Sequence, residues 1–153
     1  MKKIFSILLT VSLFLGLSTS VFAASDEDYT KGLQLIEKAN LKIDEKIEKG
    51  VAEADQLQAN YLLELGKVEA KLESSKDDNE FAKLNEEKDK LTTKYYEKLD
   101  EIIAAVYDKT LQLSTEAIAK AAEYGIEAEC TWVLVQFADK SVLIDPIRVV
   151  GEN

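Results

Sequence analysis

Apolar residues recur at spacings of mostly three and four along residues 28–74 and again along residues 78–124. Such spacing places apolar side chains on one narrow stripe of a helix, with charged side chains over the remaining surface. The chain contains only six glycines and one proline, so neither stretch holds a cluster of helix breakers. The pattern predicts two long helices of about 70 Å each, at about 1.5 Å of rise per residue.

A polar stretch, residues 74–80, separates the two predicted helices. Asp77 is followed three residues later by Glu80, a spacing that resembles a capping box and predicts the start of the second helix. The same oxygen-rich residues suggest a calcium ligand set, but the glycine of an EF-hand loop is missing and helix capping accounts for them. Folding the chain at Asp77 pairs positions whose numbers sum to about 154, which predicts an antiparallel hairpin.

Both apolar stripes contain a double four-residue step, at residues 57–65 and 91–99. A four-residue insertion locally unwinds a coiled coil, so matched steps predict that Tyr61 and Tyr95 fill one wide layer together. This match favours an antiparallel hairpin within one chain over a parallel dimer of extended chains. Asn40 also falls on the first stripe, where a polar side chain tends to fix the register of packing.

The pattern changes after the second helix, because residues 127–137 and 142–150 are rich in β-branched and aromatic residues and flank a polar turn. Two such runs predict a β-hairpin. Pro146 has no N–H donor, so its strand should lie at an edge or carry a bulge there. An isolated two-stranded hairpin is marginal in water, and we expect this one to pack on the open end of the helices. The predicted fold is therefore mainly α: a long antiparallel two-helix coiled-coil hairpin followed by a β-hairpin.

Residues 1–23 have the form of a secretory signal peptide. Lys2 and Lys3 supply the positive region, residues 4–17 form the apolar core, and a small-residue motif ends at Ala23, where we expect cleavage. The rival interpretation, an uncleaved membrane anchor, needs about 20 apolar residues, and the apolar run is shorter. The cysteine at which a bacterial lipoprotein is cleaved is also missing. The sequence predicts a protein that is secreted or extracytoplasmic, in the periplasm or the cell envelope.

Cleavage would leave a helical hairpin over residues 24–126 and the β-hairpin over residues 127–153. This mature chain has 17 basic and 29 acidic side chains, a net charge of −12. Nucleic acids and anionic membranes attract basic surfaces, so neither is an expected partner. We expect a protein partner or self-association through the C-terminal hairpin, and the sequence leaves the oligomeric state open.

The chain offers little catalytic chemistry. It has no histidine, which removes imidazole acid–base chemistry and the usual zinc sites, and no catalytic, metal-binding or cofactor-binding residue is predicted. Cys130 is the only cysteine, so it cannot form a disulfide within the chain. An intermolecular disulfide through Cys130 and a buried thiol both remain open.

The predicted hairpin has two apolar faces, whereas a sheet that is buried on one side alternates more cleanly with polar residues. In simple alternation, Cys130 shares a face with Trp132 and Leu134. We therefore expect part of the hairpin to cover the helices and part to meet a partner. The residues predicted to meet a partner are Trp132, Leu134, Val133, Val135, Phe137, Ile144, Pro146 and Arg148. The alternative, a hairpin that only caps the helices and leaves Asp145 and Arg148 exposed, stays open.

These observations favour a secreted, non-enzymatic interaction or structural protein, in which the helical rod is a spacer and the C-terminal hairpin a docking or self-assembly element. In outline, paired helices with a small β element resemble extracytoplasmic holdase chaperones and prefoldin-like proteins, although the prefoldin hairpin lies between its helices. The first alternative is therefore a holdase-type chaperone for unfolded clients. The second is a small hydrolase that uses paired carboxylates.

Overall fold

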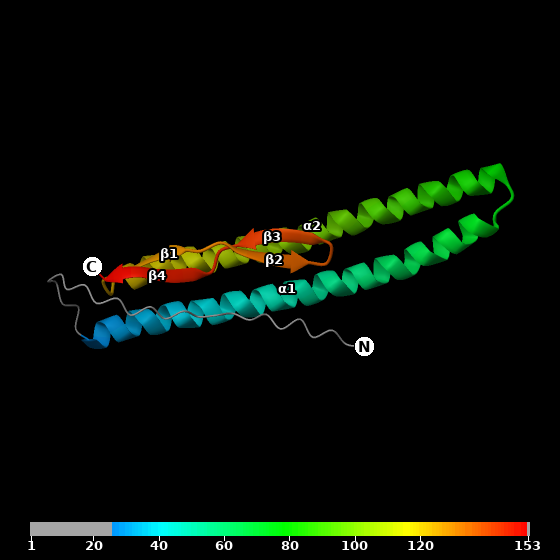
Figure 1. Ribbon diagram of the computed structural model, residues 1–153. Coiled ribbons are helices and arrows are strands. Elements are labelled where there is room, and N and C mark those ends of the chain that lie inside the picture. Colours follow the sequence, from blue (N-terminus) through cyan, green and yellow to red (C-terminus); the bar gives the residue numbers. More distant parts are fainter. Residues whose placement is uncertain (1–25, 153) are drawn as a thin grey trace.

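Two long antiparallel helices dominate the computed structural model, which describes residues 26–152 (Figure 1). Helix α1 comprises Asp26–Ser74 and helix α2 comprises Asp78–Ala122, with 49 and 45 residues. The predicted two-helix hairpin is confirmed. The predicted signal peptide, residues 1–23, lies outside the described residues. Within residues 26–152, no helix combines the length and the apolar character that crossing a membrane requires.

The turn between the helices is built by helix capping. Asp77 has extended backbone angles, and its Oδ1 accepts a hydrogen bond of 2.9 Å from the backbone N–H of Glu80. The Glu80 carboxylate in turn accepts from the hydroxyl of Ser75, at 3.0 Å, so it fastens the end of α1 to the start of α2. The cap that the sequence predicts at Asp77 is confirmed, with Ser75 as the partner of Glu80.

Aromatic stacking and one ion pair set the register of the helices. Tyr61 and Tyr95 stack with ring centroids 4.4 Å apart and an interplanar angle of 9°, which confirms the predicted shared layer. Lys88 joins Glu69 across the helices at 2.6 Å. The residue numbers of Tyr61 and Tyr95 sum to 156, close to the value of about 154 predicted by folding the chain at Asp77.

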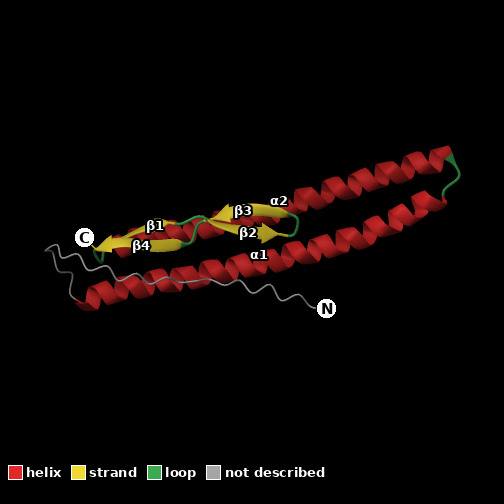
Figure 2. Ribbon diagram, viewed as in Figure 1, coloured by secondary structure: helices red, strands yellow, loops and turns green. Residues whose placement is uncertain are grey.

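The C-terminal segment forms four short strands, as Figure 2 shows. They are β1 Ile126–Cys130, β2 Val133–Phe137, β3 Lys140–Ile144 and β4 Ile147–Glu152. β1 pairs antiparallel with β4, and β2 pairs antiparallel with β3. Each of the two predicted strands is therefore divided in its middle, at residues 131–132 and 145–146.

The division has its cause at Pro146, which cannot donate a ladder hydrogen bond. Its carbonyl instead accepts from the N–H of Thr131, at 2.7 Å. At this point the two halves of the hairpin cross, as Figure 1 shows. β1 and β3 contact α2, whereas β2 contacts α1 and β4 contacts α1. At residues 131–132, and again at residues 145–146, the chain therefore passes from α2 to α1. We call these four residues the crossing.

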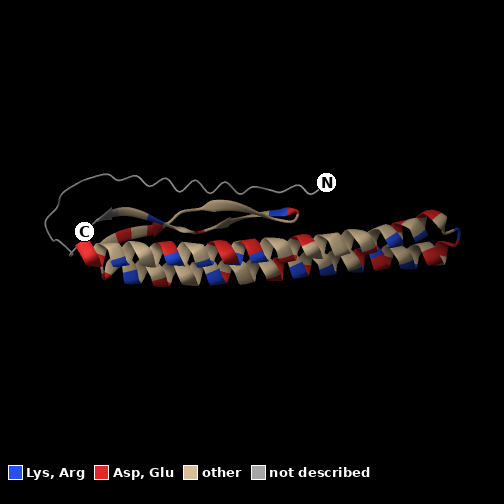
Figure 3. Cartoon of the chain, turned by 90° about the horizontal axis from the view of Figure 1, so that it is seen from below, with Lys and Arg blue, Asp and Glu red and all other residues tan. Residues whose placement is uncertain are grey.

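The hairpin lies lengthwise on the helices (Figures 1 and 3). One end lies at Gly125, which has a φ of 74° and turns the chain back three residues after α2 ends at Ala122. The other end reaches Asp139, which contacts Tyr95 near the middle of α2. The sequence predicts that the hairpin packs on the open end of the helices. In the structure the hairpin covers the whole open half of the helix pair, because its two sheets lie end to end and are together longer than one compact cap.

Two glycines of α1 allow this close packing. A Cβ atom on Gly50 would lie 2.3 Å from Cγ2 of Val106 and 3.2 Å from Cε1 of Phe137. A Cβ on Gly32 would lie 2.4 Å from Cδ1 of Ile126. Real Cβ atoms do not approach other atoms so closely, so α2 and the hairpin rest directly on the backbone of α1. Glycine lowers the helix propensity at these positions, and the close packing that it allows offsets this loss.

Buried polar groups fix the hairpin at one position along the helices. The Asn40 side chain donates to the carbonyl of Ile147 and accepts from its N–H, both at 2.9 Å. Ser114, which is fully buried, donates to the carbonyl of Asp145 at 2.6 Å. Asn40 was expected to fix a register, and the register that it fixes is that of β4 on α1.

Candidate functional site

The two faces of the hairpin differ in exposure. Phe137 and Ile144 are fully buried and Val135 almost so, since all three face the helices. Trp132 and Leu134 face away from the helices. Cys130 is half-buried and points inward, so the crossing shifts the alternation by one residue and places Cys130 on the opposite face from Trp132.

The exposed apolar residues of the hairpin centre on Trp132, Leu134 and Leu143, which are 57, 67 and 50% exposed. Leu134 and Leu143 are direct partners in the β2–β3 ladder, so their side chains lie side by side. We call these three residues the outer face. Two leucines exposed side by side on the β2–β3 sheet, with an exposed tryptophan in the crossing just before β2, form the kind of surface that marks an interaction site.

The structure narrows the set of residues predicted to meet a partner. Trp132, Leu134 and Arg148 are exposed, whereas Val133 and Pro146 are half-buried. Val135, Phe137 and Ile144 belong to the core and cannot contact a partner in this conformation. The reason is that one face of the hairpin fills the groove between the helices along its whole length.

Leu143 was missed because the sequence assigned residues 138–141 to the turn. The ladder pairs Phe137 with Lys140, so the turn consists of Ala138 and Asp139 alone. With a two-residue turn, the pairing of Leu134 with Leu143 follows directly. Ala138 gave no signal of such a turn, since its φ of 50° is one that glycine or asparagine usually occupies.

One charged pair and one neutral polar pair lie beside the outer face. Arg148 donates from Nε to Oε1 of Glu129 at 2.7 Å, and its Nη2 contacts the same oxygen. Gln136 and Ser141 hydrogen bond to each other beyond the leucine pair, at 2.5 Å. Figure 3 shows that charged residues are spread along both helices, while most of the hairpin is uncharged. A partner would therefore meet the apolar side chains without leaving an unpaired charge buried.

The tip of the hairpin is fastened to α2 through Asp139. Its two carboxylate oxygens accept hydrogen bonds from the hydroxyls of Tyr95, at 2.7 Å, and Tyr96, at 2.9 Å. Burial opposes ionisation of Asp139, but the tyrosine hydrogen bonds outweigh it and hold the pKa of this carboxyl below its usual value. Lys140 adds an ion pair with Asp100 at 2.5 Å. The outer face is thus carried by a sheet that is anchored at its tip.

Cys130 and Asp145 meet inside the crossing. Burial, followed by the neighbouring Asp145 carboxylate, raises the pKa of the Cys130 thiol, which lowers the fraction of reactive thiolate. Asp145 is fully buried, although the cap interpretation left it exposed, and its carboxylate oxygens have no hydrogen-bond partner. Neither residue lies on the outer face, so they are part of the anchored side of the hairpin.

Residues 26–152 contain no group of three or more acidic, cysteine or histidine side chains that is placed to hold a metal ion. The acidic residues at the turn, Asp77 and Glu80, serve as caps. The outer face is therefore the feature of the described chain that most resembles a binding surface.

Comparisons with known protein families, with curated proteins and with solved structures find no match to this chain. The class of protein is thus defined by architecture alone: a mainly helical protein with a long two-helix hairpin and a twisted β-hairpin along its open half.

Proposed function

We propose that this is a secreted, non-enzymatic interaction protein in which the helical rod is a spacer and the outer face of the C-terminal hairpin docks a protein partner or a second copy of the chain. The observation that carries the proposal is the exposure of Trp132, Leu134 and Leu143 on the side of the hairpin that faces away from the helices, while Val135, Phe137 and Ile144 on the opposite side are buried. A sheet with so well packed an inner face has no structural need for an apolar outer one.

The position of the outer face along the molecule supports a spacer role. The hairpin covers only the open half of the helix pair, and the remaining half extends toward the turn at Asp77. α1 alone is about 70 Å long at about 1.5 Å per residue. A partner held on the outer face would therefore be separated from the turn by a stiff helical arm.

The secreted location rests on the signal-like residues 1–23. The mature chain would carry a net charge of −12, of which residues 24–126 contribute −9 and residues 127–153 contribute −3. This charge keeps copies apart except where an uncharged surface meets a complementary one. Two copies that meet through the apolar outer face would therefore experience less charge repulsion than two copies that meet through the charged surfaces of the helices.

The experiment replaces Trp132, Leu134 and Leu143 together by threonine, which keeps β propensity while removing apolar area. The matched control replaces Leu62 and Leu63 by glutamine, because these helix residues are similarly exposed, at 55 and 62%. Sedimentation of residues 24–153 measures self-association, and cross-linking in the extracytoplasmic fraction measures docking. We expect the triple variant to associate at least ~30-fold more weakly, because losing one aromatic anchor costs about 2 kcal/mol or more.

The control variant should associate like the wild type. Equal behaviour of the triple variant and the wild type in both measurements would refute the proposal, provided that circular dichroism shows both to be folded.

A holdase-type chaperone is the second candidate, and the exposure of Leu62, Leu63 and Phe81 in the half near the turn favours it. A holdase grips unfolded clients through exposed apolar surface. The test is suppression of the aggregation of an unfolding client. If the variant with glutamine at Leu62 and Leu63 loses this activity and the variant with threonine on the outer face keeps it, this candidate is favoured over the first.

A further inference from the structure

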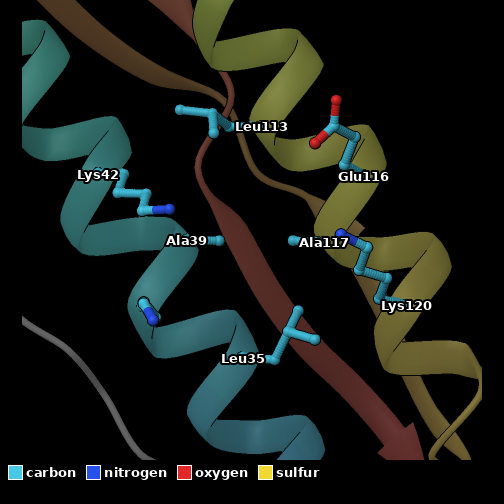
Figure 4. A pocket seen from close by; sticks show the side chains of 8 residues that line it. Leu35, Ala39, Lys42, Leu113, Glu116, Ala117 and Lys120 are labelled. Atoms are coloured by element: carbon cyan, nitrogen blue, oxygen red, sulfur yellow. The ribbon is translucent and has the colours of Figure 1, made fainter.

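A hollow lies between α1 and α2 on the side away from the hairpin (Figure 4). Ala39 and Ala117 face each other across the gap between the helices, and they are too small to fill it. Leu35 and Leu113 lie at the two ends. The hollow is an open groove with a volume of about 200 Å³, and we call it the alanine groove.

The back of the alanine groove is closed by the hairpin. β4 crosses behind the gap, as Figure 4 shows, and Asn40 beside Ala39 holds Ile147 of that strand through two hydrogen bonds. β4 contacts α1 at this level and lies on the hairpin side of the gap, so the hollow opens on the opposite side. Its floor, formed by Ala39 and Ala117, is apolar.

Three lysines surround this apolar floor: Lys38 and Lys42 from α1 and Lys120 from α2. The ion pairs formed within residues 26–152 involve none of the three. The acidic residue of the lining, Glu116, accepts a hydrogen bond of 2.8 Å from Gln112. The rim therefore carries an excess of positive charge in a chain whose net charge is −10.

This arrangement has a cost in the empty protein. Lys38 and Lys42 are like charges four residues apart on one helix, a placement that destabilises the helix. An anion bound between them and Lys120 would remove the repulsion and gain charge-assisted hydrogen bonds. A purely apolar ligand would leave the repulsion in place.

We propose that the alanine groove binds a small amphipathic anion, a carboxylate on a short aliphatic or aromatic body. The body lies on Ala39 and Ala117 between the two leucines, and the carboxylate meets the lysines at the rim. The volume corresponds to about seven water molecules at ~30 Å³ each, which suits a short acyl chain or one aromatic ring rather than a long lipid.

The test uses octanoate as the probe and residues 24–153 as the protein, with binding measured by calorimetry and by backbone amide shifts. Octanoate should bind and perturb amides around Ala39 and Ala117, while octanol and octyltrimethylammonium should bind at least ~10-fold more weakly, as expected when a charged hydrogen bond is lost.

Two kinds of variant separate the charge from the cavity. Lys38→Gln with Lys42→Gln should weaken octanoate binding ~10-fold or more, whereas the control Lys46→Gln with Lys49→Gln, on the same helix outside the groove, should not. Ala39→Leu should fill the hollow and abolish binding. If Ala39→Leu disturbs folding, the lysine pair still tests the proposal, because those side chains are exposed.

Absence of octanoate binding at about 1 mM, equal binding of the cationic analogue, or no effect of the Lys38 and Lys42 changes would each overturn the proposal. It does not depend on the outer face. The variant with threonine at Trp132, Leu134 and Leu143 should bind octanoate like the wild type, so either proposal can fail without the other.

Discussion

Adding one methyl group at Gly50 tests whether the hairpin and both helices pack as one body. The new Cβ would lie 2.3 Å from Cγ2 of Val106 and 3.2 Å from Cε1 of Phe137. Val106 is β-branched within a helix and has one strongly preferred rotamer, so it cannot turn away. Phe137 is fully buried. Gly50→Ala must therefore displace α2 or the tip half of the hairpin.

Two opposing terms decide the effect of Gly50→Ala on the free energy of unfolding. Alanine is favoured over glycine in a helix by about 1 kcal/mol. Overpacking a well-filled core costs about 1–3 kcal/mol, and the 2.3 Å approach lies toward the upper end. The expected net loss is about 1–2 kcal/mol. Because 1 kcal/mol shifts the melting temperature of a domain of this size by roughly 4 °C, Tm should fall by about 4–8 °C.

Gly66→Ala is the matched control, because it makes the same change in the same helix. A Cβ on Gly66 meets no atom within 4 Å, so only the propensity term acts and the protein should gain about 1 kcal/mol. Urea unfolding followed by circular dichroism at 222 nm measures both variants. If Gly50→Ala stabilises the protein as much as Gly66→Ala does, the close contact with Val106 is refuted.

A double-mutant cycle identifies Val106 as the residue that resists the change. Val106→Ala alone should destabilise by about 2 kcal/mol, because it opens a cavity in the core. Combined with Gly50→Ala it should cost less than the sum of the two single changes, since the shortened side chain makes room for the new methyl group. Strict additivity would mean that the strain lies elsewhere.

Three further predictions concern the anchoring of the hairpin. Ala138→Gly should stabilise the protein by about 0.5–1 kcal/mol in urea unfolding, because Ala138 has a φ of 50° and glycine carries no Cβ penalty there. Asn40→Ala should cost about 2–3 kcal/mol and speed amide exchange in β4, because it leaves both backbone groups of Ile147 unpaired in a partly buried site. The hydrogen bonds that lower the pKa of Asp139 stabilise the fold above the unfolded-state pKa of about 4, and this contribution is lost as pH falls through the lower folded-state pKa. The urea midpoint should therefore fall less between neutral and acid pH for Asp139→Asn than for the wild type. An equal fall would contradict the role of the Tyr95 and Tyr96 hydrogen bonds.

The helices could be predicted because their information is local. Apolar spacing is continuous from residue 28 to residue 124 apart from the turn, and the Asp77 cap needs only neighbouring residues. The stacking of Tyr61 on Tyr95 could be predicted for a different reason, since an antiparallel hairpin fixes which residues meet once its turn is known.

The crossing could not be predicted, because it depends on contacts between distant parts of the chain. Asn40 and Ile147 are separated by 107 residues, and no local sequence pattern predicts that the side-chain amide of Asn40 will hydrogen bond to the backbone of Ile147. Alternation within residues 127–137 assumes an unbroken strand, so it placed Cys130 with Trp132. The hydrogen bond from Thr131 to Pro146 breaks the strand and reverses that assignment.

The packing of the hairpin also determines how its function can be tested. Removing residues 127–153 would expose the apolar groove that Phe137, Ile144 and Ile147 fill, all of them part of one core with both helices. At about 2–5 kcal/mol for each of these three large buried side chains, the loss of about 6–15 kcal/mol would be comparable with the whole stability of an ordinary domain, about 5–15 kcal/mol. Loss of association in such a truncated chain would report unfolding rather than docking. Only substitutions on the outer face separate the two effects, because Trp132, Leu134 and Leu143 lie outside that core.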